Sequence, residues 1–197
     1  MIEVFVFIDP GFSGALSTFH QFKKPDGELH FYPASVHDMP VIKDIIAITK
    51  GKKKPVTKKI VHNRLNIPKL FDIIGNDTTD VKKIMVVLEE PQLRFKDSKQ
   101  SLRTSFREYG KMIGVLEFLG IEYKEVSPID WKAKVFPDNR GKKKDKKRLK
   151  TDSVILAGKL YPGLKKQLVG KRKGLKDGRA EALLLGYYYF NFCDKGH

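Results

Sequence analysis

The sequence predicts an α/β protein in which helices flank a mixed β-sheet. Strand-like segments come first, and helices and strands then alternate along the chain. Residues 14–20 and 28–33 are joined by "KKPDGE", whose Pro-Asp-Gly predicts a turn, so that with 2–9 they form a three-strand antiparallel meander. The run "KKIMVVLEE" is continuously apolar and rich in branched residues, which is typical of a central strand covered on both faces.

The segment between the meander and that central strand has a weaker pattern. Residues 36–60 give no clear prediction, although "VIKDIIAITKG" is compatible with a short helix that ends at Gly51. "IPKLFDIIGND" predicts a short helix that stops at Gly-Asn.

The second half of the chain alternates more plainly. Apolar residues spaced by three and four predict a helix over 101–119, and "IEYKEVSP" predicts a strand. Ser127 and Pro128 can begin a short helix, "PIDWKAKVF", in which we expect Trp131 to pack on the sheet. A basic loop over 138–150 precedes a helix opened by Thr151, and "DGRAEALLLGYYYFNF" is the last helix.

Composition points to one domain spanning 1–197. A chain of 197 residues with 41% hydrophobic content can bury one sizeable core. No stretch is long and apolar enough for a membrane span, and no signal pattern precedes the first strand, so we expect an intracellular protein. The single cysteine, Cys193, excludes an internal disulfide framework and a Cys-based zinc site.

The charge of the chain indicates a polyanionic partner. The formal net charge is +16, and the basic residues gather near 50–59, 139–150 and 165–176, the first two as apparent insertions. One such run is usually only a solvated loop. Three of them on a small domain favour nucleic acid, since Lys and Arg neutralise phosphates.

Four acids occupy positions that turn chemistry alone explains incompletely. Asp9 ends the first strand and Glu89 ends the central one. Taken singly, each favours a plainer interpretation, Asp-Pro-Gly as an ordinary turn and Glu89 as an ordinary loop charge. Asp177 and Glu181 are four apart and share one face of the last helix. Asp177 also suits a helix cap, but a cap does not explain Glu181 beside "ALLLG".

Divalent cations would compensate all four carboxylates. Mg²⁺ and Mn²⁺ prefer oxygen ligands, and two ions about 4 Å apart can activate water and stabilise a leaving oxygen at one phosphorus. In a basic chain, this acid set predicts a metal-dependent phosphodiesterase acting on DNA or RNA.

These motifs resemble the RuvC family of Holliday-junction resolvases in the ribonuclease-H-like superfamily, and its viral and phage branch in particular. "FIDPGFSGALS", "VVLEEPQ" and "DGRAEALLLGYY" are similar to the family's three acidic motifs, in order. The span from "SLRTSF" to "WKAKVF" resembles the helix-strand-"P..WK" layout, and "KTDSVILAGKLYP" resembles the Lys-led helix. The resemblance covers most of the chain, least over 36–75. The last helix departs from the bacterial pattern, because its acids are four apart rather than three.

The resemblance implies a ribonuclease-H-like fold and a homodimeric endonuclease that nicks opposite strands of a four-way DNA junction symmetrically. Asp9 would bridge two Mg²⁺ or Mn²⁺ ions, Glu89 and Glu181 would each hold one, and Asp177 would complete or orient the site. The helix over 101–119 is the candidate dimer interface, because Gly110 and Gly114 permit close approach, although it can equally pack wholly on its own sheet.

Further residues are assigned to DNA. Leu93 and Phe95 are the candidates for a side chain that wedges the junction open, and Lys173 or Lys176 for a cation that steadies transition-state charge. The residues expected to contact DNA are Lys132, Lys134, Lys142, Lys143, Lys144, Lys146, Lys147, Arg148, Lys173 and Lys176.

Two rival functions remain open from the sequence. One is another nuclease of the same fold, such as a packaging or branched-DNA nuclease or an RNase H. The other is a non-catalytic DNA-binding protein whose acids serve as turns and caps. The branch resembled implies a viral or phage source, with action in the cytoplasm of the infected cell.

Overall fold

Five strands form the central sheet in the order β3-β2-β1-β6-β7. The computed structural model describes residues 2–50, 56–77, 83–92, 98–137, 146–170 and 174–193. The strands are β1 (Val4–Ile8), β2 (Ala15–Lys23), β3 (Leu29–Asp38), β6 (Ile84–Glu89) and β7 (Glu122–Val126). β1 pairs antiparallel with β2, which pairs antiparallel with β3, whereas β6 runs parallel to both β1 and β7.

This pattern of directions confirms the predicted α/β class with a mixed central sheet. A three-strand meander is extended by two parallel strands, and the chain must cross over through helices to reach each of them. β1 and β6 therefore end at one edge of the sheet, which we call the carboxyl edge. β3 also reaches this edge, because Asp38 at its end pairs with Ala15 at the start of β2.

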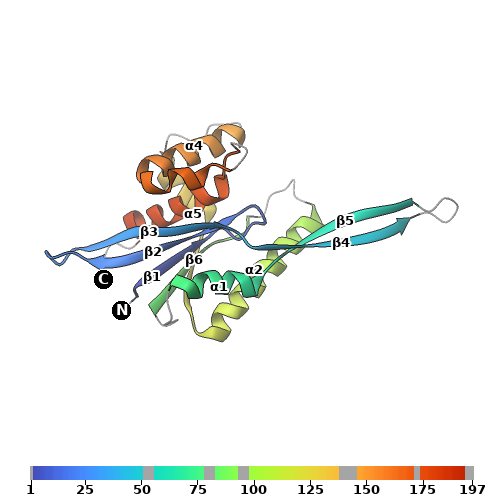
Figure 1. Cartoon of the computed structure of the whole chain (residues 1–197), viewed down its shortest axis with the longest axis horizontal. Coiled ribbons are helices and arrows are strands. Elements are labelled where there is room, and N and C mark those ends of the chain that lie inside the picture. Colours follow the sequence, from blue (N-terminus) through green and yellow to red (C-terminus); the bar gives the residue numbers. More distant parts are fainter. Residues whose placement is uncertain are drawn as a thin grey trace.

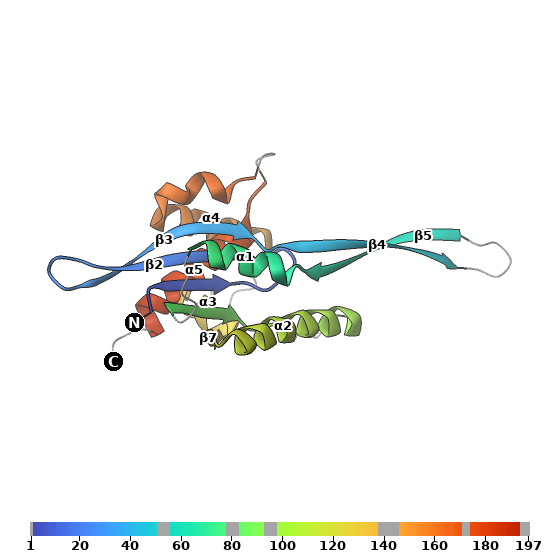
Figure 2. The same ribbon diagram turned by 60° about the horizontal axis from the view of Figure 1, so that its bottom comes forward.

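Helices cover both faces of the sheet (Figures 1 and 2). α1 (Ile67–Asp77) and α2 (Lys99–Leu119) lie on one face, and α3 (Pro128–Val135), α4 (Lys146–Leu160) and α5 (Asp177–Tyr188) lie on the other. A 3-10 helix, η3 (Pro162–Leu168), precedes α5, and a π-helical segment, η4 (Tyr189–Cys193), follows it. No helix in the described ranges is long and apolar enough to cross a membrane.

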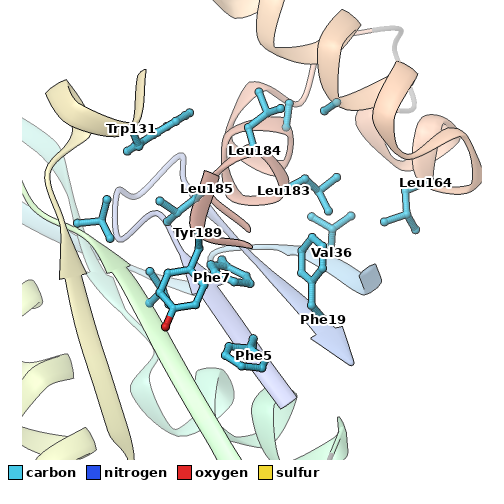
Figure 3. Packing of buried hydrophobic residues seen from close by; sticks show 14 of the residues in the cluster. Phe5, Phe7, Phe19, Val36, Trp131, Leu164, Leu183, Leu184, Leu185 and Tyr189 are labelled. Atoms are coloured by element: carbon cyan, nitrogen blue, oxygen red, sulfur yellow. The ribbon is translucent and has the colours of Figure 1, made fainter. Parts of the chain in front are cut away.

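Period-2 alternation in β1 divides the core into two layers. Phe5 and Phe7 face the α3–α5 layer, whereas the intervening valine and Ile8 face α1 and α2. In Figure 3, Tyr189 lies beside Phe7 of β1, and its ring also contacts that of Phe5. Since every residue of β1 is buried, the apolar run at the start of the chain is a strand covered on both faces.

The predicted helix over 41–51 is wrong. The chain instead forms β4 (Val41–Lys50) and β5 (Val56–Leu65), an antiparallel two-stranded sheet separate from the main one. Isoleucine, valine and threonine, which are stiff at χ1 and favour strands, make up much of both segments. The register pairs each residue of β4 with one of β5. Local periodicity does not reveal such a partner.

The predicted start of the fourth helix at Thr151 is also wrong. α4 begins at Lys146, inside the segment expected to be a basic loop. Lysine and arginine are good helix formers, so a run of them need not be a loop. The rest of that loop, 138–145, lies outside the described residues.

Candidate functional site

Three of the four predicted acids converge at the carboxyl edge. Asp9 follows β1, Glu89 ends β6, and Glu181 projects from α5. Because Ile8 is in register with Leu88, the acids that follow them lie on neighbouring strands. Repulsion from Glu181 acts on both Asp9 and Glu89, so the three side chains share one electrostatic environment.

The ammonium of Lys132 lies among these carboxylates. Lys132 is on α3, and its Nζ lies 2.8 Å from Oε2 of Glu181 and 3.6 Å from Oε1 of Glu89. It also contributes to the electrostatics of Asp9. One cation therefore lies among three acids and offsets part of their repulsion. We call these four residues the Lys132 cluster: Asp9, Glu89, Glu181 and Lys132.

Trp131 orients the side chain of Glu89. Its indole is fully buried, as expected from the sequence, and its Nε1–H donates a 2.8 Å hydrogen bond to Oε2 of Glu89. A buried indole N–H requires an acceptor, so the bond satisfies Trp131 and orients Glu89 together.

Two glycines let the Asp9 loop approach α5. The Gly11 N–H donates to Oδ1 of Asp9 at 3.1 Å. A Cβ on Gly14 would lie 2.8 Å from Cγ of Asp9, and a Cβ on Gly178 would collide with the carbonyl oxygen of Ser13. Real Cβ atoms do not approach other atoms so closely, so both positions need glycine for the loop and the helix to pack as they do.

Burial is the main influence on the pKa values of Asp9 and Glu89. Desolvation raises the pKa of Glu89 to about 7, against a smaller opposing effect of Lys132. Desolvation likewise raises the pKa of Asp9, while the Gly11 N–H acts in the opposite direction. Burial disfavours the charged form of Lys132, but the attraction of Glu181 and Glu89 outweighs it and raises the Lys132 pKa. The site is therefore short of positive charge.

Asp177 lies at the rim of the site. Its carboxylate pairs with Lys150 of α4, while its repulsion of Asp9 is the smallest of the effects on that group. Lys176, proposed to steady transition-state charge, instead forms a 2.7 Å ion pair with Asp38, which Arg179 also contacts at 2.7 Å. These contacts tie the start of α5 to the end of β3.

The remaining assignments fall on the surface or outside the described residues. Lys134 is exposed on α3. For the basic residues that begin α4, the structure describes the backbone but not the side chains. For the other assigned positions, it describes neither. The first group is Lys146, Lys147 and Arg148, and the second is Leu93, Phe95, Lys142, Lys143, Lys144 and Lys173.

The chemistry of the cluster fits a divalent cation. It offers carboxylate oxygens, the ligands that Mg²⁺ and Mn²⁺ prefer, and its negative charge exceeds that of one lysine. Among the described residues, no three His, Cys, Asp or Glu side chains are already arranged to hold an ion. Asp9, Glu89 and Glu181 are the residues that could hold one, with Lys132 moving from between them.

Sequence reasoning missed the positions of two lysines. Lys132 was expected to face phosphate, but it contacts the acids themselves. Lys150 was part of a basic run without an assigned role, and it pairs with Asp177. No local pattern signals either contact, because each partner lies on another element.

Comparison with known proteins finds solved structures that resemble this chain at low sequence identity. No family model and no curated protein matches the sequence. RuvC from T. thermophilus in complex with Holliday junction substrate is 10% identical over 96% of both chains, with a TM-score of 0.46. A Thermus thermophilus RuvC structure is 11% identical over 95% of both chains, with a TM-score of 0.44. Identities this low say nothing about which residues act in catalysis.

The raised pKa of Glu89 predicts a specific pH dependence of stability. Between the ordinary value of 4.5 and the folded value of about 7, the native protein binds more protons than the unfolded chain, so stability falls as pH rises. In the metal-free protein, Glu89→Gln removes this loss. We expect the variant to gain about 1–3 kcal/mol relative to the wild type between pH 5 and pH 8.

Urea unfolding in EDTA at the two pH values measures this difference. Glu90→Gln, which changes the exposed neighbouring acid, is the matched control and should follow the wild type. If the unfolding free energy of Glu89→Gln changed with pH as that of the wild type does, the pKa of Glu89 would not be raised in the folded protein.

Proposed function

We propose that the chain is a Mg²⁺- or Mn²⁺-dependent endonuclease that resolves four-way DNA junctions by paired, symmetric nicks. The observation that carries the proposal is the convergence of Asp9, Glu89 and Glu181 at the carboxyl edge of a ribonuclease-H-like sheet. Residues 1–197 would act as one nuclease domain. The resemblance of its motifs to those of the RuvC family supports the choice of junction over other DNA.

Each residue of the site has a distinct task. Asp9, Glu89 and Glu181 would hold the ions, which when bound supply Lewis-acid activation of water and stabilisation of the leaving oxygen. Trp131 keeps Glu89 oriented through its N–H. Lys132 maintains the acids close together before an ion arrives, and afterwards offers its ammonium to phosphate. Asp177, paired with Lys150, would position the rim.

The basic surface supports DNA as the partner. A net charge of +16 attracts phosphate, which the acids alone would repel. The similarity of the motifs to the viral and phage branch supports a viral or phage origin, with action in the infected cell.

We also propose that the enzyme works as a homodimer through α2. A two-fold junction cut on opposite strands requires two active sites related by symmetry. On α2, Gly110 and Gly114 are exposed, and beyond the adjoining turns of α2 itself no described atom lies within 4 Å of a Cβ built on either. Phe118, which is 87% exposed, lies four residues beyond Gly114. This surface is therefore open to a second copy.

Asp9→Asn tests the catalytic role. The amide keeps the shape and the Gly11 hydrogen bond but removes the charge that binds cations. We expect junction binding within about twofold of the wild type and a cleavage rate lowered by about 10³-fold or more, consistent with the loss of one electrostatic group. Gel assays on a four-way junction with Mg²⁺ measure both.

Comparing the cleavage rates of several nucleic-acid substrates separates the proposed function from its rivals. The wild type should cut four-way junctions in symmetric pairs, and flaps, duplexes and RNA–DNA hybrids more slowly. Preferred cleavage of the hybrid would indicate an RNase H. An undiminished rate for Asp9→Asn would remove Asp9 from the mechanism.

Gly110→Gln/Gly114→Gln tests the dimer. Both side chains have room in the monomer, and replacing glycine in an exposed helix stabilises it by about 0.5–1 kcal/mol per site. We therefore expect a folded monomer where the wild type sediments as a dimer. Gly75→Ala, in open space on α1, is the control. A monomeric wild type, with and without junction DNA, would contradict the proposal.

A further inference from the structure

The β4–β5 ribbon extends well beyond the body of the protein (Figures 1 and 2). Each strand has 10 residues, so the ribbon is about 33 Å long at ~3.3 Å per residue. That length matches about one turn of duplex DNA. The principal contacts of each strand are with the other.

Hydrogen bonds anchor the base of the ribbon at the carboxyl edge. We call this base, where β4 begins and β5 ends, the root. The Met39 N–H, just before β4, donates to the carbonyl of Gly14 in the Asp9 loop at 3.0 Å. The Leu65 N–H, at the end of β5, donates to Oε2 of Glu108 at 3.0 Å. The Glu108 side chain is 2% exposed and is also held by Lys111 of α2 at 2.8 Å. The ribbon therefore starts beside the candidate active site and points away from it.

The charge of the ribbon is strongly positive. Asp44 is the one acid in the two strands, and it pairs with Arg64 at 2.8 Å. The register places Lys58 opposite Ile48 and Lys59 opposite Ala47, in the half that is distant from the root. The basic residues of the two strands are Lys43, Lys50, Lys58, Lys59 and Arg64.

A ribbon of this kind needs a partner. A two-stranded hairpin is only marginally stable in water by itself, and Ile45 is 66% exposed near the root. A second ribbon is a poor partner for the distal half, because that half carries Lys50, Lys58 and Lys59 and no acid. A phosphate backbone offers the opposite charge, and a two-stranded ribbon fits a groove of duplex DNA.

We propose that the β4–β5 ribbon is a DNA-binding arm that lies along one duplex leading away from the carboxyl edge. The inference rests on the proposed nuclease function for the identity of the DNA, but its evidence is the placement and charge of the ribbon. The arm would hold the duplex about 10 base pairs beyond the site, at 3.4 Å per base pair. It would add affinity without reading sequence.

Lys58→Ser/Lys59→Ser tests the role of the β4–β5 ribbon. The substrates are four-way junctions whose DNA arms are closed by hairpin loops. Arms of about 20 base pairs exceed the reach of the ribbon and arms of about 6 fall short of it, at 3.4 Å per base pair. In EDTA, we expect the variant to bind long-armed junctions more weakly, with a salt slope lower by about 1 per lysine, hence about 2. With short arms, variant and wild type should bind alike.

Lys23→Ser/Lys24→Ser is the matched control. These two adjacent lysines belong to the β2–β3 hairpin at the opposite edge of the same sheet, so the same charge is removed far from the site. The affinity of the control variant for junctions should depend on the length of the DNA arms as the wild-type affinity does. Circular dichroism verifies the fold of both variants.

The outcomes separate the arm from the nuclease. Suppose that the wild type cuts junctions and that the affinity of Lys58→Ser/Lys59→Ser depends on DNA arm length as the wild-type affinity does. The proposal that the ribbon binds DNA is then wrong, and the proposed nuclease function stands. If the variant sediments at half the wild-type mass, the ribbon joins two copies, and the DNA-binding arm is again wrong. If the wild type binds neither junctions nor duplex, both proposals fail.

Discussion

The burial of like charges at one edge of a sheet is the constraint on which the structure depends. Asp9 and Glu89 end adjacent strands, and Glu181 faces them from α5, so folding forces three carboxylates together. Burial raises the pKa of both strand-end acids, and one ammonium, that of Lys132, offsets only part of the repulsion. Such strain persists where a site is built for a ligand that relieves it, and a cation is the ligand we propose here.

The surrounding chain serves to maintain this arrangement. Gly14 and Gly178 let a loop and a helix approach to distances that a Cβ would prevent, and the Trp131 N–H holds one acid in place. The same edge supports the root of the ribbon through the Gly14 carbonyl, so the proposed grip on DNA and the acids share one loop. Binding along the ribbon would thus deliver a phosphate backbone to the carboxylates.

Much of this fold is predictable from the sequence because its signals are local. The continuous apolar run over 84–89 and the turn after β2 identify a buried strand and a meander. β4 was not predictable, since its spacing of apolar residues suits a helix until the next strand, β5, pairs with it. Likewise, strand ends and helix spacing pointed to the acids, whereas Lys132 depends on how α3 packs across from α5. Contacts between separate elements are set by tertiary packing, which no sequence window contains.

The most direct test of the central claim is a crystal structure of the full chain soaked in Mn²⁺, recorded with anomalous scattering. Relief of carboxylate repulsion predicts an anomalous peak in contact with oxygens of Asp9 and Glu89, and Lys132 displaced from between Glu89 and Glu181. Carboxylates that stay on Lys132, with no anomalous peak at the carboxyl edge, would contradict the account.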